Sequence, residues 1–409
     1  MKILVVLADS IQVNSSANLC HLAYIKGLLD SGHDVTLISA SNDVRKIDPS
    51  IIIPEDVHLY TFSAISLYEK FALKMNQHSE PQLVSAEQNN AEQKSSFSNI
   101  RSTLVRKIKN FALSLYGPHG IYMPFVRKAQ RFKSSIEYDY VLSLAFPTAS
   151  HLLAHKLLSK KHIRAKKWIQ IWEDPWNTCF HHVPTPKTYK AEYKLLSCAE
   201  SICYVSPLTL KNQIQAFPEF ASKMYWQPLP HYYKNENGAN ITFDKKVFGY
   251  FGDYNPSIRN LEPFYLAAKD ENIHVNICGN PNNLFPQTER IHIYPRLSLD
   301  QLKPIEDNSN VLVFLCNRLG GQIPGKIYQY SSTNKIVLFI LDGTDEEKQT
   351  LINFFKPFKR YVFCENTVED IKKAIKIIEN NQLNDINNEP LDAFNPKIII
   401  QNILEGKSI

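Results

Sequence analysis

Two apolar runs near the end of the chain enclose a short polar segment, and this arrangement constrains the fold more than any other feature. The first run is Asn310 to Cys316 and the second is Ile336 to Leu341. Between them lie a Gly-Gly turn and the segment Ile323 to Lys335, which begins Ile-Pro-Gly-Lys. The order predicts a strand, a glycine-bearing loop, a short helix and a second strand. Such a unit is typical of an α/β protein with a parallel sheet.

The start of that predicted helix is suited to binding an anion. A helix that begins after a glycine-rich loop offers free backbone N–H groups and the positive end of its dipole. Lys326 adds a positive charge at a position where a helix normally favours an acidic residue. A tight turn with a solvated lysine explains the same residues equally well, so this segment alone leaves both interpretations open.

Length and composition indicate a two-domain soluble protein. A chain of 409 residues exceeds one ordinary core, so we expect two domains of roughly 150–230 residues each. No apolar run approaches a membrane span, and the apolar start is too short for a signal peptide. The seven cysteines form no C-x-x-C pair and show no metal-ligand spacing. These patterns predict a cytoplasmic, reduced protein without a metal site, and its net charge of +6 suits phosphate-bearing partners. We expect no nucleic acid partner.

The N-terminal half begins as an open α/β domain. Lys2 to Ala8 predicts a buried strand, Asn18 to Asp30 a helix capped by Ser15 or Ser16, and Val35 to Ser39 a second strand. The first turn, from Asp9 to Ser16, contains no glycine, so the dinucleotide-binding fingerprint is absent. This half is therefore predicted to bind an acceptor rather than a nucleotide.

A basic amphipathic helix is predicted at Arg101 to Tyr116. Its apolar residues fall on one face and Arg101, Arg106, Lys107 and Lys109 lie around the rest. Such a helix can rest on an anionic membrane surface or pack on its own domain with a solvated basic face. A lipid-linked acceptor would favour the interpretation that this helix docks on the inner membrane.

Acidic residues follow a strand-like run in the first half. Further strands are predicted at Tyr140 to Leu144, Trp168 to Trp172 and Ser201 to Val205. Glu173 and Asp174 come directly after the second of these, where ligands bind in open α/β sheets. Asp174 can instead cap a turn before a proline. A polar segment from Tyr232 to Lys246 predicts an interdomain linker.

Three loops of the second half are expected to meet at one sheet edge. They are Gly252 to Arg259, Gly279-Asn280 and Asn317 to Lys326, each following a predicted parallel strand. Arg259 and Lys326 would then bring two cations to one cleft, which is enough to hold a diphosphate.

These residues carry a resemblance. The two Rossmann-like halves, a Gly-x-x-Gly turn, Arg259 and Ile-Pro-Gly-Lys-x-Tyr-x-Tyr resemble the retaining GT-B-fold glycosyltransferases of bacterial capsule and O-antigen biosynthesis (glycosyltransferase family 4-like). The resemblance implies an α/β GT-B fold with two Rossmann-like domains facing a central cleft. It implies an acceptor domain at residues 1–231, a nucleotide-sugar domain at 245–390, and a helix at 391–409 that crosses back to the first domain.

The resemblance also implies the site. Lys326, Arg259 and Asp174 are the predicted catalytic residues. The predicted donor-binding residues are Gly252, Asp253, Tyr254, Asn280, Gly320, Gly321, Pro324, Gly325, Tyr328 and Gln329. The acceptor is expected near Ser15, Asn18 and Glu173. Gly321 and Gln329 replace the two glutamates of the family's Glu-x7-Glu pattern, and the Gln329 amide oxygen can still accept a ribose hydrogen bond.

The predicted reaction is metal-independent transfer of a sugar from a nucleotide-sugar to a saccharide or polyprenyl-diphosphate-linked acceptor. Lys326 and Arg259 would stabilise the departing diphosphate, and no cofactor is expected. Two alternatives remain at this point: a sugar-nucleotide 2-epimerase of the same shape, and a non-catalytic nucleotide-sugar-binding or assembly protein.

Overall fold

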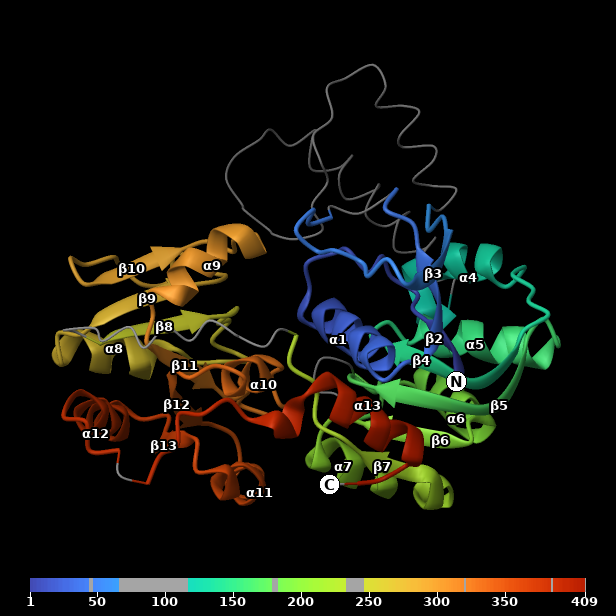
Figure 1. Ribbon diagram of the computed structural model, residues 1–409. Coiled ribbons are helices and arrows are strands. Elements are labelled where there is room, and N and C mark those ends of the chain that lie inside the picture. The colour runs from blue at the N-terminus through green and yellow to red at the C-terminus, as the bar shows by residue number, and fades with distance from the viewer. Residues whose placement is uncertain are drawn as a thin grey trace, which may run out of the picture.

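The computed structural model describes residues 1–43, 47–65, 117–178, 183–232, 246–319, 321–383 and 385–408. It contains two parallel sheets, of seven and six strands, each flanked by helices (Figure 1). The α/β fold with two Rossmann-like sheets that the sequence predicted is confirmed. The predicted basic helix at 101–116 lies outside the described residues.

The first sheet has the strand order β3-β2-β1-β4-β5-β6-β7. Its strands are β1 (Lys2–Val6), β2 (Asp34–Ala40), β3 (Val57–Phe62), β4 (Glu137–Ala145), β5 (Arg164–Trp172), β6 (Ser201–Tyr204) and β7 (Met224–Trp226). The helices around it are α1 (Ser16–Asp30), α4 (Met123–Ala129), α5 (Ala149–Ser159), α6 (Pro186–Cys198) and α7 (Pro207–Ala216), with short 3-10 turns η1 (Gly117–Tyr122) and η2 (Pro218–Lys223). Every strand pair is parallel.

The second sheet has the order β10-β9-β8-β11-β12-β13. Its strands are β8 (Val247–Phe251), β9 (His274–Cys278), β10 (Ile291–Tyr294), β11 (Val311–Leu315), β12 (Ile336–Leu341) and β13 (Tyr361–Glu365). Its helices are α8 (Glu262–Asp270), α9 (Leu299–Asp307), α10 (Lys326–Ser331), α11 (Asp345–Phe355) and α12 (Val368–Glu379), with 3-10 turns η3 (Lys356–Phe358) and η4 (Asp392–Phe394). The predicted strand–loop–helix–strand unit is therefore β11, α10 and β12.

Strands at the centre of both sheets are buried on both faces. All five residues of β11 are buried, as are the last five of β12. This pattern is expected where helices cover each side of a parallel sheet. The register pairs Phe251 with Cys278, and Cys278 with Tyr294. The loops after β8, β9 and β10 therefore start at one common edge of the second sheet.

The last helix, α13 (Pro396–Glu405), lies on the first sheet although it follows the second in sequence (Figure 1). The Tyr225 hydroxyl donates to the carbonyl of Ile403 (2.7 Å), and the Gln227 amide donates to that of Lys407 (2.6 Å). At Gly27 the backbones of α1 and α13 approach so closely that a Cβ would lie 2.4 Å from the Pro396 carbonyl oxygen. Glycine permits this approach.

A buried arginine fixes the exit of α10. Arg360 is fully buried, and its guanidinium donates to the carbonyls of Thr333 (2.8 Å) and Lys335. Both carbonyls belong to the turn between α10 and β12, where buried backbone groups need donors of this kind. Arg360 thus holds the short element that begins at Lys326 in a defined position.

Candidate functional site

The loops after β8 and β9 are joined through their backbones. Gly252 N–H donates to the Cys278 carbonyl (2.9 Å), and Tyr254 N–H donates to that of Asn280 (2.7 Å). The Asp253 carboxylate accepts from Asn280 N–H (3.0 Å). A Cβ on Gly279 would lie 2.0 Å from the Gly252 carbonyl oxygen. Only glycine fits there, so Gly279 allows the two loops to form one surface.

Arg259 connects this surface to the loop after β11. Its Nε donates to the Asn317 side-chain oxygen (2.7 Å), and Nη1 donates to the Asp253 carbonyl (3.2 Å). The Tyr250 hydroxyl donates to the same carbonyl (3.1 Å). Burial raises the pKa of Tyr250 to about 12, while the charge of Arg259 opposes the shift. The structure therefore brings Arg259 to two of the three predicted loops.

Lys326 is the first residue of α10 and has different partners. Its Nζ lies 3.8 Å from the Glu306 carboxylate of α9 and 5.9 Å from the centroid of the Tyr330 ring. The side chain is 35% exposed, which leaves it accessible to a ligand. Both cations follow loops at the C-terminal edge of the second sheet. Because α10 has only six residues, the positive charge at this edge comes from the two side chains rather than from the helix dipole.

The glycine-bearing loop before α10 faces the first domain. The Ser206 hydroxyl donates to the Gly321 carbonyl (2.6 Å), and a Cβ on Gly321 would lie 2.7 Å from that of Leu208. Gly321 also has a φ of +67°, which favours glycine. A Cβ on Gly325 would lie 3.1 Å from the Ser16 hydroxyl. This loop is therefore held between the second sheet and the helices α1 and α7.

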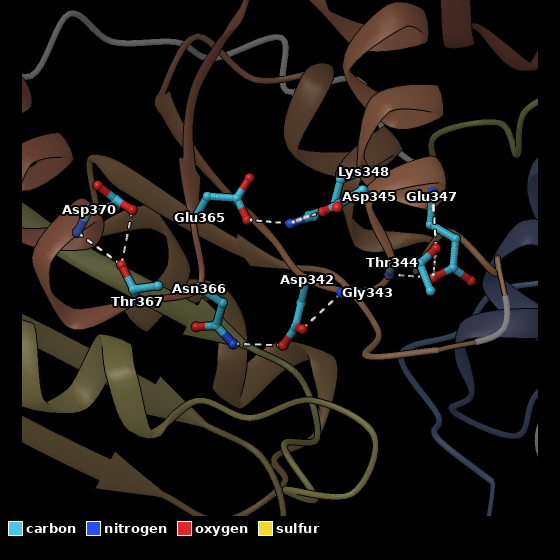
Figure 2. Close-up of polar contacts among 10 residues, drawn as sticks. All are labelled: Asp342, Gly343, Thr344, Asp345, Glu347, Lys348, Glu365, Asn366, Thr367 and Asp370. Carbon is cyan, nitrogen blue, oxygen red and sulfur yellow. Dashed lines mark hydrogen bonds and ion pairs between the residues drawn. The ribbon is translucent and has the colours of Figure 1, made fainter.

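The neighbouring part of the edge is acidic and internally paired, as Figure 2 shows. Asp342 accepts from the Asn366 amide (2.7 Å) and from Gly343 N–H (2.8 Å). Lys348 lies 2.9 Å from the Glu365 carboxylate and 3.0 Å from that of Asp345. The described partners of these carboxylates lie within this part of the edge.

Asp174 connects the two domains. It follows β5 and accepts a hydrogen bond from the side-chain amide of Gln322, which lies in the loop before α10. Burial, and then the charge of Glu173, raise the pKa of Asp174 to about 7. A carboxyl group with that pKa changes charge near neutral pH, as a catalytic acid or base requires.

Glu173 itself faces inward. It is buried, and its Oε1 lies 2.9 Å from Nε2 of His21, a fully buried residue of α1. The prediction that Glu173 contacts the acceptor does not fit this position. The carboxylate is instead directed at His21 of α1.

Two other predicted acceptor residues have structural roles. Ser15 caps α1, and its hydroxyl accepts from Asn18 N–H (3.2 Å). The buried Asn18 amide donates to the carbonyls of Ser10 (2.9 Å) and Val13 (3.0 Å). These bonds shape the loop after β1. Acceptor contact through Ser15 and Asn18 is therefore not what the structure favours.

Three predicted donor residues also point elsewhere. Tyr254 and Tyr328 are fully buried and pack against Phe285 and Phe394, respectively, so their rings belong to the core. The Gln329 amide oxygen accepts from the backbone N–H of Tyr232 (2.8 Å), so it is turned to the start of the predicted linker rather than to a ribose. Pro324 lies in the loop before α10, where its carbonyl accepts from Ile327 N–H (3.3 Å). Gly320 lies outside the described residues.

The sequence reasoning missed three residues at the domain boundary. Arg296 follows β10, and it lies 3.3 Å from the Asp253 carboxylate and donates to the Asn14 carbonyl of the first domain (3.4 Å). Gln322 and His21 contact the two acidic residues after β5. Arg296 could have been predicted, because it comes two residues after a strand. His21 could not, because it falls within the apolar stripe of α1.

Among the residues that the structure describes, no cluster of three or more His, Cys, Asp or Glu residues could hold a metal ion. Within the same residues no helix has both the length and the apolar character needed to cross a membrane.

Comparison with known proteins identifies the class of fold. No protein-family model matches the chain, and no curated protein matches its sequence. Solved structures do match it along nearly the whole length. HepE from Anabaena, in complex with UDP and glucose, has 12% identity and a TM-score of 0.53, covering 99% of this chain and 97% of that one.

Two further structures match similarly. An alpha,alpha-trehalose 6-phosphate synthase from Burkholderia multivorans has 9% identity and a TM-score of 0.53, covering 100% and 96% of the two chains. A trehalose-6-phosphate structure from E. coli bound with UDP-2-fluoro glucose has 11% identity and a TM-score of 0.52, with the same coverage. The chain therefore has a GT-B-like fold of two Rossmann-like domains.

Proposed function

We propose that this chain is a glycosyltransferase that moves a sugar from a nucleotide-sugar to a hydroxyl group of a saccharide acceptor. The supporting observation is that Arg259 and Lys326 follow loops at a single edge of the second sheet. Two cations in a partly buried position can hold a diphosphate. The fold is one in which HepE was crystallised with UDP and glucose, which supports a nucleotide-sugar as the ligand.

The positions of the two positive side chains and of Asp174 suggest how the sugar is transferred. As the bond between the sugar and the phosphate breaks, its electrons pass to the diphosphate, and Arg259 and Lys326 stabilise the added negative charge. The acceptor oxygen forms the new bond to the sugar, and its proton passes to Asp174. Gln322 holds the Asp174 carboxylate beside the donor loop. These steps call for no metal ion.

We propose an acceptor and a pathway as well. The resemblance to capsule and O-antigen enzymes favours a role in cell-surface polysaccharide biosynthesis with a polyprenyl-diphosphate-linked acceptor. The mildly basic charge of the chain fits contact with an anionic membrane surface.

Turnover of candidate donors tests the function. The full chain is incubated with UDP-, GDP- and dTDP-sugars, with and without saccharide acceptors, and release of nucleoside diphosphate is measured. A transferase releases nucleoside diphosphate quickly only when an acceptor is present. An altered sugar without any acceptor would instead indicate a 2-epimerase, and no reaction with any donor would indicate a binding protein.

We predict that turnover depends on the ionisation of Asp174. Because its pKa is about 7, the carboxyl group is protonated at lower pH and cannot accept a proton. We expect kcat/KM to fall about tenfold per pH unit below pH ~6, and Asp174→Asn to lower it by about 10²–10⁴-fold. The pH profile from 5 to 9 measures this, and Asp56→Asn, at an exposed site of the same domain, serves as the control.

The ionisation of Asp174 also affects folding stability, in the direction opposite to its effect on turnover. The folded-state pKa of Asp174 is raised above its unfolded value, so its stabilising effect is present at low pH and is lost as the pH rises through about 7. Asp174→Asn should therefore raise the melting temperature at pH 8 relative to wild type, and change it less at pH 5. A flat pH–rate profile together with an unchanged melting temperature would contradict the role assigned to Asp174.

A further inference from the structure

A cavity of about 130 Å³ lies in the first domain, apart from the predicted acceptor residues. It opens at the C-terminal ends of β2 and β3, beside the loop that follows β1. Leu59 and Thr61 of β3 both line it, as residues two apart on one face of a strand do. An enclosed cavity of about 150 Å³ admits benzene, so this smaller, open one takes one face or edge of a single ring, with the rest of the ring outside it.

The polar wall of the cavity is prearranged. The Gln12 side-chain amide donates to the Ile51 carbonyl (3.0 Å) and its oxygen accepts from the Asn42 amide (2.7 Å). The Asn42 oxygen in turn accepts from the Ser10 hydroxyl. Each primary amide has two N–H donors, and the described contacts use one of each. The remaining donors, with the Thr61 hydroxyl, can bind a ligand without reorganisation.

The opposite wall is apolar, and none of the described residues that line the cavity has an ionisable side chain. Ile11, Ile53 and Leu59 supply the apolar side. Amide and hydroxyl groups facing an aliphatic wall match the hydroxyl edge and the C–H face of a neutral sugar. They offer nothing to neutralise a phosphate or a carboxylate, and no aromatic ring on which a nucleobase would stack.

The cavity lies next to the boundary between the domains. Gln12 belongs to the same loop as Asn14, whose carbonyl accepts from Arg296 of the second domain (3.4 Å). Asp48 accepts from the Asn14 amide (2.8 Å) and from Leu299 N–H of the second domain (3.3 Å). A ring bound in the cavity therefore rests against the loop that touches the donor domain.

We propose that this cavity is a binding subsite for one neutral sugar ring of the acceptor, held by Gln12, Asn42 and Thr61 on its hydroxyl edge and by Leu59 on its C–H face. The proposal rests on the proposed function, since it names the substrate class of the same enzyme. It also replaces Ser15, Asn18 and Glu173 as the acceptor contacts.

Binding without any nucleotide tests the subsite. Saturation-transfer NMR is recorded on the full chain with the methyl glycosides of glucose, galactose and N-acetylglucosamine. We expect at least one to bind, and Leu59→Trp, which fills the cavity, to abolish its signal. Thr61→Val removes one hydroxyl and should weaken the signal by about fivefold, the loss of one net hydrogen bond. Ile52→Trp adds the same bulk at a neighbouring residue that is 76% exposed and outside the cavity, so it should bind normally.

The outcomes separate the subsite from the transferase. If no glycoside binds, or if binding is unchanged in both Leu59→Trp and Thr61→Val, the subsite is wrong. Transfer by Leu59→Trp with a wild-type KM for the acceptor would also overturn it, while leaving the transferase assignment intact. If a glycoside binds as expected but no nucleotide-sugar is ever turned over, the subsite stands and the transferase assignment fails.

Discussion

Replacing Lys326 by alanine is expected to lower nucleotide-sugar turnover by about 10²–10³-fold, as the loss of one charge-stabilising group at a departing anion does. The side chain is 35% exposed and its Glu306 partner is 3.8 Å away, so the ion pair contributes little to folding. The melting temperature should therefore stay close to that of wild type. Initial rates with the preferred donor and acceptor measure the effect.

A nearby lysine provides the control. Lys303 lies on α9, is 70% exposed, and pairs with Asp307 at 3.3 Å. Lys303→Ala removes the same charge from the same region and should retain wild-type turnover. If Lys326→Ala is as active as Lys303→Ala, Lys326 does not contact the diphosphate.

Gly279→Ala is expected to damage both stability and donor binding. The new Cβ would lie 2.0 Å from the Gly252 carbonyl oxygen and 2.6 Å from its carbon, both of them backbone atoms that cannot rotate away. Overpacking of this kind costs about 1–3 kcal/mol of unfolding free energy. The loops after β8 and β9 must also separate, which displaces Asp253 and the Arg259 that donates to its carbonyl.

Gly252→Ala is the control that shows whether alanine is tolerated in these loops in general. A Cβ on Gly252 would meet its nearest neighbour, the Tyr250 hydroxyl, at 3.6 Å, which is an ordinary contact. Urea denaturation should show Gly252→Ala close to wild type and Gly279→Ala clearly destabilised. Equal stability of the two variants would mean that the approach of these loops is not tight.

Much of the fold was predictable because its signal is local. The apolar runs at β1, β5, β11 and β12 are buried on both faces, and such strands appear in a sequence as continuous hydrophobic stretches. The edge strand β3 was missed because only Val57 of its six residues is buried. An edge strand of this kind carries no apolar run, and only its pairing with β2 defines it.

The site was less predictable because it depends on which neighbours a side chain finds. Arg259 and Lys326 were found from their positions after strands, and their place at the sheet edge follows from parallel topology. Gln329 looked free to bind a ribose, yet the backbone N–H of Tyr232, 97 residues away at the start of the predicted linker, donates to its oxygen. No local pattern reports such a contact.

The acceptor side was hard to predict for the same reason. Ser15 and Asn18 are polar residues at the start of a helix, and the sequence does not distinguish a cap from a ligand contact. The cavity at Leu59 and Thr61 depends on three separate segments, so it is visible only once they are assembled. Its lining residues are ordinary surface types with no motif.

The most direct test of the central claim is calorimetric titration of the wild-type chain, Arg259→Ala and Lys326→Ala with UDP, GDP and dTDP. We predict that one of these nucleoside diphosphates binds wild type with one-to-one stoichiometry, and that each variant binds it at least about tenfold more weakly, the loss of one charge-assisted contact. Binding of equal strength in all three proteins, or no binding to wild type, would contradict it.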